Sequence, residues 1–206
     1  MTQAKQRFRT IEQYAALDPS DLPEGNYELV DGVIVEMGAE SDQNLEIVAL
    51  LFSVLPQFVP YYLLRKGTEI NVPSRLTSRY PDLMVLTEDT RAAMKRDKRS
   101  LVALDMPTPA LVVEVVSPGK PGSDNYEQLR CGEPVRDYVE KPKEYAARGI
   151  PEFWQVDPNP DRAVVIVLTL KNGAYQSREF RGSDRVVSPT FPDLKLTAEQ
   201  ILRAGR

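Results

Sequence analysis

Three acidic residues stand at positions where the surrounding sequence predicts β-strands. Glu28 lies in the segment YELV, Asp82 precedes the segment LMVL, and Glu114 lies inside VVEVV. Carboxylates are unusual in such segments, because an ionised group taken out of water costs several kcal/mol unless something compensates its charge. Each acid therefore needs either a partner or a functional reason for its position.

Glu114 gives the sharpest signal of the three. Residues 111–113 and 115–116 are all apolar, which predicts a strand buried on both faces. Because side chains alternate along a strand, Glu114 is expected on the same face as Val112 and Val116. One polar position on an apolar face indicates that Glu114 lies at the rim of a cleft. For all three acids the alternative is a carboxylate without catalytic function, either paired with a cation or exposed at the edge of a sheet.

The chemistry open to these acids is limited by what the chain lacks. There is no histidine, and the single cysteine, Cys131, cannot form an intrachain disulfide or a Cys-rich zinc site. Converging carboxylates repel one another unless a cation lies between them, and Mg²⁺ or Mn²⁺ prefers such oxygen ligands. A metal there would polarise a phosphoryl oxygen and lower the pKa of an attacking water. A nearby lysine would orient that water or stabilise the developing negative charge.

Periodic segments predict the elements that would position these acids. The order along the chain is helix, hairpin, helix, strands, helix, strands, which indicates a mixed α/β (α+β) fold with helices on the faces of a sheet. Helices are predicted for residues 10–17, 41–59, 136–150 and 196–205, with Thr10, Ser41 and Thr197 as N-caps and Gly149 as a C-cap. Strands are predicted for residues 27–37 (a hairpin around Asp31-Gly32), 62–72, 83–86, 111–116, 152–157, 163–170 and 173–180.

Composition fits one domain over residues 1–206, with a short helical extension at residues 1–20. The chain has 206 residues, of which 42% are hydrophobic and 27% charged. No apolar run reaches the ~18 residues of a membrane span, and the first residues lack the apolar core of a secretory signal. We therefore expect no membrane association and a cytoplasmic location.

The net charge of −4 is unlike that of a tight non-specific nucleic-acid binder. A carboxylate metal site contributes negative charge that bound cations would neutralise. The candidates for phosphate contacts are residues 91–99, Arg65, Lys66, Arg75 and Arg79. A solvated charged surface is the alternative for this group.

The dipeptide Pro81-Asp82, the segment VVEVVSP and the segment EYAARGIPEFWQVDP together resemble the Uma-two family. Its members are described as putative restriction endonucleases of the PD-(D/E)XK nuclease superfamily, and the resemblance covers residues 27–202. It implies a restriction-endonuclease-like mixed sheet flanked by helices. It also implies that Asp82 and Glu114 are catalytic ligands of Mg²⁺ or Mn²⁺, that Glu28 is a third catalytic acid, and that Lys141 is the catalytic lysine.

The lysine is the least direct of these assignments, because Val116 occupies the place where the superfamily usually has one. Lys141 precedes Tyr145 by four residues, which puts both side chains on one helical face. Pro142 is tolerated only in a first helical turn and would place Lys141 at the start of the helix. The competing lysines are Lys120 and Lys143.

Two features depart from the pattern of the family. Asn44 stands where members often carry a histidine, and residues 128–135 look like an insertion within a loop at residues 119–136. The cost of closing a loop grows slowly with its length, so we expect the fold to tolerate the insertion.

The function that the resemblance implies is metal-dependent hydrolysis of DNA phosphodiester bonds by an endonuclease. A homodimer fits this function, since two active sites are needed to cut both strands in one encounter. The alternatives are a catalytically inactive nuclease-fold protein that serves as a binding or interaction module, and another carboxylate–metal phosphotransferase. The chain has no GxxxxGK[ST] loop, which argues against nucleotide hydrolysis.

Overall fold

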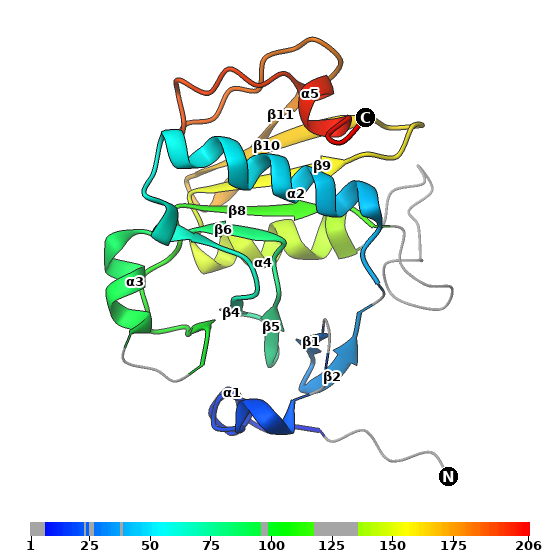
Figure 1. The fold of residues 1–206 in the computed structure, drawn as a ribbon. Coiled ribbons are helices and arrows are strands. Elements are labelled where there is room, and N and C mark those ends of the chain that lie inside the picture. Colours follow the sequence, from blue (N-terminus) through cyan, green and yellow to red (C-terminus); the bar gives the residue numbers. More distant parts are fainter. Residues whose placement is uncertain (1–6, 23, 25–26, 38, 96–98, 118–135) are drawn as a thin grey trace.

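The structure is a computed structural model that describes residues 7–22, 24, 27–37, 39–95, 99–117 and 136–206 (Figure 1). Its helices are α1 (Ile11–Ala15), α2 (Asp42–Val54), α3 (Glu88–Met94), α4 (Lys141–Arg148) and α5 (Ala198–Leu202), with a π-helical segment at Arg136–Glu140. Short 3-10 turns lie at Pro19–Asp21, Leu55–Gln57 and Tyr61–Leu63. Its strands are β1 (Tyr27–Val30), β2 (Val33–Glu36), β3 (Leu64–Arg65), β4 (Glu69–Val72), β5 (Thr77–Arg79), β6 (Leu83–Val85), β7 (Leu101–Val102), β8 (Leu111–Val115), β9 (Glu152–Asp157), β10 (Val164–Lys171) and β11 (Ala174–Phe180).

These strands form two mixed sheets. The larger has the order β11-β10-β9-β8-β6-β3, and the smaller has the order β2-β1-β5-β4-β7. In the larger sheet β8 runs parallel to β9 and the other neighbours pair antiparallel. The mixed sheet expected from the sequence is therefore confirmed, with a second small sheet beside it.

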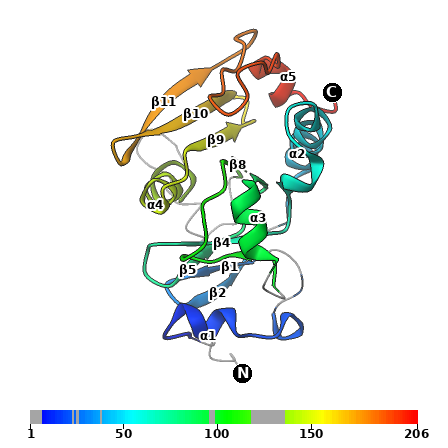
Figure 2. The ribbon, with the colours of Figure 1, turned by 90° about the vertical axis from the view of Figure 1, so that its left-hand side faces the viewer.

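Helices cover both faces of the larger sheet. Figure 2 shows α2 and α5 on one side of it and α4 on the other. The core under α2 includes Leu51 and Val113, whereas the core under α4 includes Val112 and Tyr145. All five residues of β8 are buried, so this strand is covered on both faces, as its apolar run predicts.

The predicted helix caps are confirmed. The side chains of Thr10, Ser41 and Thr197 each accept a hydrogen bond from a backbone N–H in the first turn of the helix that follows. Gly149 ends α4 in the left-handed conformation, with a φ of 85° that favours glycine. The hairpin around Asp31-Gly32 also forms, as the β1–β2 pair.

The single strand predicted for residues 62–72 is wrong. The chain forms β3, turns at Gly67 and continues as β4, and the two strands belong to different sheets. Gly67 has a φ of 72°, a conformation that breaks strand geometry and that L side chains rarely adopt. The short strands β5 and β7, which pair with β1 and β4 in the smaller sheet, had no sequence prediction.

The helix α1 packs on the smaller sheet (Figure 1). Phe8 and Tyr14 form a buried cluster there with Tyr27 and Leu29 of β1. Of the predicted extension, residues 7–20 are described, and residues 128–135 of the predicted insertion lie outside the described residues. Within the described chain, no helix combines the length and apolar character that a membrane span requires.

Candidate active site

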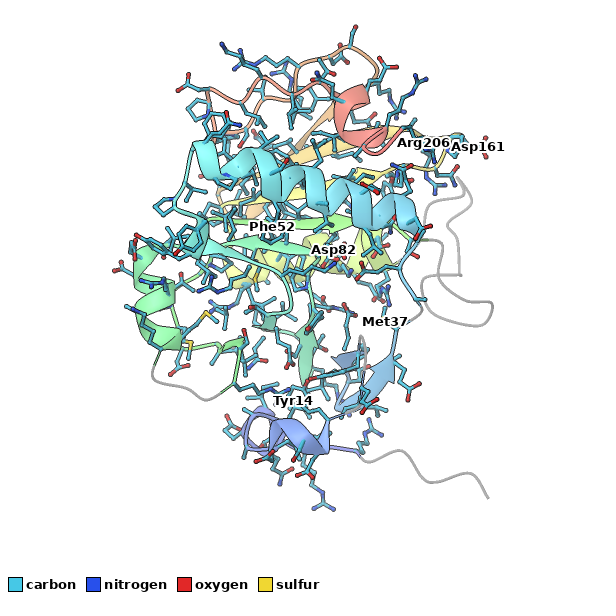
Figure 3. All side chains as sticks on the ribbon, viewed as in Figure 1. Tyr14, Met37, Phe52, Asp82, Asp161 and Arg206 are labelled. Carbon is cyan, nitrogen blue, oxygen red and sulfur yellow. The ribbon has the colours of Figure 1, made fainter. Side chains whose placement is uncertain are left out.

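A cavity of about 430 Å³ brings together the three acids and the lysine that the sequence predicts for the site. Glu28 reaches it from β1, Asp82 from the residue before β6, Glu114 from β8 and Lys141 from the first turn of α4. Residues of both sheets and of α4 therefore meet in one place. Figure 3 labels another lining residue, Met37, beside the end of β2, together with Asp82.

Glu114 is buried because it has two partners on α4. Its Oε2 accepts a hydrogen bond from Lys141 Nζ at 2.7 Å, and its Oε1 accepts one from the Tyr145 hydroxyl at 2.6 Å. Burial raises the pKa of Glu114, the Lys141 ammonium opposes that effect, and the negative charges of Glu28 and Asp137 add to it. The carboxylate thus lies both on the rim of a cavity and against a buried cation.

Lys141 occupies the position that the helical pattern predicts. Lys141 and Tyr145 share one face of α4, since both contact Glu114, and Pro142 falls in the first turn of that helix. Lys141 is buried, whereas the competing Lys143 is exposed, and Lys120 lies outside the described residues.

Acidic neighbours hold Lys141 in its charged form. Burial alone would lower the pKa of Lys141, but the carboxylates of Glu114, Asp137 and Glu28 raise it above its ordinary value. Lys141 Nζ lies 3.2 Å from Asp137 Oδ1 and 3.9 Å from Glu28 Oε1. These carboxylates therefore favour the ammonium form of the Lys141 side chain, which donates a hydrogen bond to Glu114.

Asp82 is hydrogen-bonded to the backbone of β8 at Val115, the residue that follows Glu114. Its Oδ2 accepts a hydrogen bond from the Val115 N–H at 2.6 Å. Burial first, and then the charge of Glu114, raise the pKa of Asp82 to about 8, with a smaller contribution from Glu40. The negative charge of Glu114 therefore disfavours the ionised form of Asp82, the other carboxylate predicted as a metal ligand.

Surrounding cations stabilise the ionised form of Glu28. Arg79 Nη1 donates to Glu28 Oε2 at 2.8 Å, and the cationic nitrogens of Lys141 and Arg136 lie at 3.9 Å. Although burial opposes ionisation, Lys141, Arg79 and Arg136 lower the pKa of Glu28 to about 2. Glu28 is thus placed to orient Lys141 and Arg136 rather than to bind a proton.

The structure corrects the interpretation of two basic residues. Arg79 was a candidate for phosphate contacts, but it is 1% exposed and is held by Glu28 and Glu144. Arg99 is bound to Glu69 at 2.6 Å and stacks over Tyr14. These arginines stabilise the interior of the protein, because a buried carboxylate needs a nearby cation.

The sequence prediction missed Tyr145, Arg136 and Asp137 as members of the site. Arg136 and Asp137 lie on the π-helical segment that leads into α4, and Tyr145 lies one turn after Lys141. A signal existed for Tyr145, whose helical spacing from Lys141 is visible in the sequence. The sequence gives no such signal for Arg136 and Asp137, because their position depends on the π-helical segment before α4.

The donor set fits a hard divalent cation. Among the described lining residues there are five carboxylates, from Glu28, Glu40, Asp82, Glu114 and Asp137, and three cations, from Lys66, Arg136 and Lys141. The described chain contains no group of three or more His, Cys, Asp or Glu side chains arranged to hold a metal ion. Mg²⁺ is often held by one or two carboxylates and keeps waters or substrate oxygens as its other ligands, and Asp82 and Glu114 supply carboxylates of that kind.

The low pKa of Glu28 predicts a contribution to stability that acid removes. The folded-state pKa of about 2 lies below the ordinary value of 4.5, so this contribution is present above pH 4.5 and is lost as the pH falls toward 2. At neutral pH we expect Glu28→Gln to lower the free energy of unfolding by on the order of 3 kcal/mol. Urea unfolding of wild type and variant should show this gap narrowing below about pH 4.5.

The exposed Glu12 on α1 supplies a control for this experiment. Glu12→Gln should leave the pH dependence of unfolding as in the wild type. A gap between wild type and Glu28→Gln that stays constant with pH would contradict the role of the ionised Glu28.

Comparisons with known proteins agree with the family predicted from the sequence. A chain described as "a putative nuclease belonging to DUF820 from Anabaena variabilis ATCC 29413" matches with a TM-score of 0.64 and 18% identity, over 94% of this chain and 97% of that one. At this identity the match shows a shared fold alone, and no curated protein matched the sequence. The family model Uma2, described as "Putative restriction endonuclease", matches residues 11–199. Since this match spans most of the sequence, the chain belongs to the Uma2 family.

Proposed function

We propose that the protein is a metal-dependent DNA endonuclease, of the PD-(D/E)XK type, that hydrolyses phosphodiester bonds. The observation that carries the proposal is the meeting of Asp82, Glu114 and Lys141 in one cavity, with Lys141 Nζ 2.7 Å from Glu114 Oε2. Two carboxylates and an ammonium group supply the parts that phosphodiester hydrolysis requires when histidine is absent.

In this proposal Asp82 and Glu114 hold Mg²⁺ or Mn²⁺. When bound, the metal supplies Lewis-acid polarisation of a phosphoryl oxygen and lowers the pKa of an attacking water. The two carboxylates would hold the metal from the residue before β6 and from β8, and the Val115 N–H orients Asp82 by donating a hydrogen bond to it. Burial raises the pKa values of both carboxylates, and a bound cation would favour their ionised forms, which would couple the charge of the site to metal binding.

Lys141 acts in this proposal as a hydrogen-bond donor. Because its acidic neighbours favour its ammonium form, it can position the attacking water or stabilise the negative charge that develops on the phosphoryl oxygens. Glu28 is a positioning residue, which orients Lys141 and Arg136 from the other side of the cavity. In-line attack would leave a 5′-phosphate, and a homodimer would bring two such sites to one duplex.

The test is cleavage of supercoiled plasmid DNA by the purified protein. We expect nicked and linear products with Mg²⁺ or Mn²⁺, none with EDTA, and ends that a DNA ligase can rejoin without added kinase. Asp82→Asn should abolish the products. If the folded wild type neither cleaves DNA nor binds Mn²⁺ in calorimetry, the interpretation as an inactive binding module replaces this proposal.

A further inference from the structure

The cations that line the cavity differ in their access to solvent. The side chains of Lys141 and Arg136 are 5% and 11% exposed, and both contact buried acids. The side chain of Lys66 is 43% exposed. Among the described lining residues, Lys66 is thus the cation that an incoming anion can reach without displacing the interior of the site.

The turn between β3 and β4 holds Lys66 at the cavity wall. Gly67 follows with a φ of 72°, and a Cβ at this glycine would lie 3.1 Å from the Tyr80 hydroxyl. Tyr80 itself lines the cavity. The turn therefore packs closely against a cavity residue, and it presents the Lys66 side chain toward the same space as Asp82 and Glu114.

Glu40 forms an ion pair with Lys66 in the protein without DNA. Lys66 Nζ lies 3.4 Å from Glu40 Oε2, and the Glu40 side chain is 21% exposed. Glu40 lies immediately before Ser41, the N-cap of α2, and its charge also acts on Asp82. The Glu40 carboxylate thus contacts the accessible cation and also acts electrostatically on one of the proposed metal ligands.

Resting on the proposed endonuclease function, we propose that Lys66 binds a backbone phosphate of the DNA beside the scissile one, and that Glu40 competes with this phosphate for Lys66. A partly exposed ion pair is weak, so an entering phosphate can replace Glu40 at Lys66. The exchange keeps Lys66 paired, and it moves the Glu40 carboxylate away from a cavity in which negative groups outnumber positive ones.

Binding of a fluorescein-labelled DNA duplex tests this proposal, with Ca²⁺ in place of Mg²⁺ to slow cleavage and anisotropy as the readout. Lys66→Ala should weaken binding about 10-fold and reduce the slope of log K against log salt by about 1, the loss expected for one phosphate contact. Glu40→Gln should tighten binding about 3-fold with little change of that slope. The double variant should bind like Lys66→Ala, since Glu40 acts through Lys66.

Two exposed residues remote from the cavity serve as charge-matched controls. Lys171→Ala on β10 and Glu12→Gln on α1 should leave both affinity and salt slope as in the wild type. The melting temperatures of all variants should agree with that of the wild type, because the Lys66–Glu40 pair is partly exposed.

Several results would overturn the inference. If the wild type cleaves DNA and the Lys66→Ala and Lys171→Ala variants bind DNA with equal affinity, the contact between Lys66 and phosphate is refuted. The proposed endonuclease function would still hold in that case. Weaker binding with an unchanged salt slope would also refute a phosphate contact. Loss of Mn²⁺ affinity in Glu40→Gln would make Glu40 a metal ligand rather than a competitor. A folded wild type that binds no DNA would overturn both this inference and the proposed function.

Discussion

Glu114→Gln is expected to lower the rate of DNA cleavage by about 10³-fold or more while the protein keeps its fold. Glutamine has the shape of glutamate, so its amide oxygen can still accept a hydrogen bond from Lys141, while its NH2 group can donate to the Tyr145 hydroxyl oxygen in place of the bond that Tyr145 now donates. What it loses is the negative charge that a divalent cation requires. Removing a carboxyl whose pKa is raised by burial also removes a destabilising charge. Lys141 keeps Asp137 as an acidic partner at 3.2 Å, so the melting temperature should change little.

Two measurements separate the chemistry of Glu114 from its packing. Single-turnover cleavage should lose its rate, and calorimetric titration with Mn²⁺ should lose the saturable heat seen in the wild type. Glu140→Gln is the matched control, since Glu140 precedes α4 and its side chain is 44% exposed. If Glu114→Gln unfolds, or cleaves as fast as the wild type, Glu114 is a structural residue and the metal assignment fails.

The strand and helix periods explain why Glu114 and Lys141 could be found in the sequence. Alternation along β8 predicts that Glu114 shares a face with Val112, and Val112 belongs to the core under α4. A four-residue step along α4 predicts that Lys141 and Tyr145 point the same way. Local periodicity thus fixed the direction of each side chain, although the assignment of Lys141 itself rested on the family resemblance.

The partners of Glu28 could not be predicted in this way. Arg79 is 51 positions away in the sequence and reaches Glu28 only because β5 packs beside β1 in the smaller sheet. That sheet was not anticipated, since β5 has the polar sequence Thr-Ser-Arg and lacks an apolar pattern. The same polarity made Arg79 look like a surface residue, whereas tertiary pairing with Glu28 and Glu144 buries it.

The turn at Gly67 shows a second limit of periodicity. Residues 62–72 are predicted as one strand because apolar residues lie on both sides of the turn, at 62–64 and at 70 and 72. A glycine inside a strand pattern indicates only a bulge or a close backbone approach. In the structure the chain crosses there from the larger sheet to the smaller one. The crossing places Lys66, a candidate for phosphate contacts in the sequence, at the cavity. The position of Lys66 there therefore depends on a turn that the sequence did not predict.

Lys141→Met is expected to lower turnover by about 10²–10³-fold and to leave Mn²⁺ binding intact or slightly tighter. The rate falls because the ammonium group that stabilises the developing charge is gone. Mn²⁺ affinity is retained because Asp82 and Glu114 are unchanged, and because a positive charge 2.7 Å from Glu114 Oε2 no longer repels the metal. The measurements are single-turnover cleavage and calorimetric titration of the same protein preparations.

The neighbouring Lys143 on α4 provides the matched control, because it is exposed where Lys141 is buried. Lys143→Met should cleave at the wild-type rate. If Lys143→Met instead cleaves slowly while Lys141→Met cleaves at the wild-type rate, the catalytic role belongs to Lys143. Lys141→Met also leaves Glu114 and Asp137 without their shared cation, which costs about 3–5 kcal/mol when a buried pair is broken. Rates are therefore compared well below the melting temperature of the variant. Since a merely structural lysine would lose Mn²⁺ binding and cleavage together, loss of the rate alone identifies Lys141 as a group that acts in the transition state.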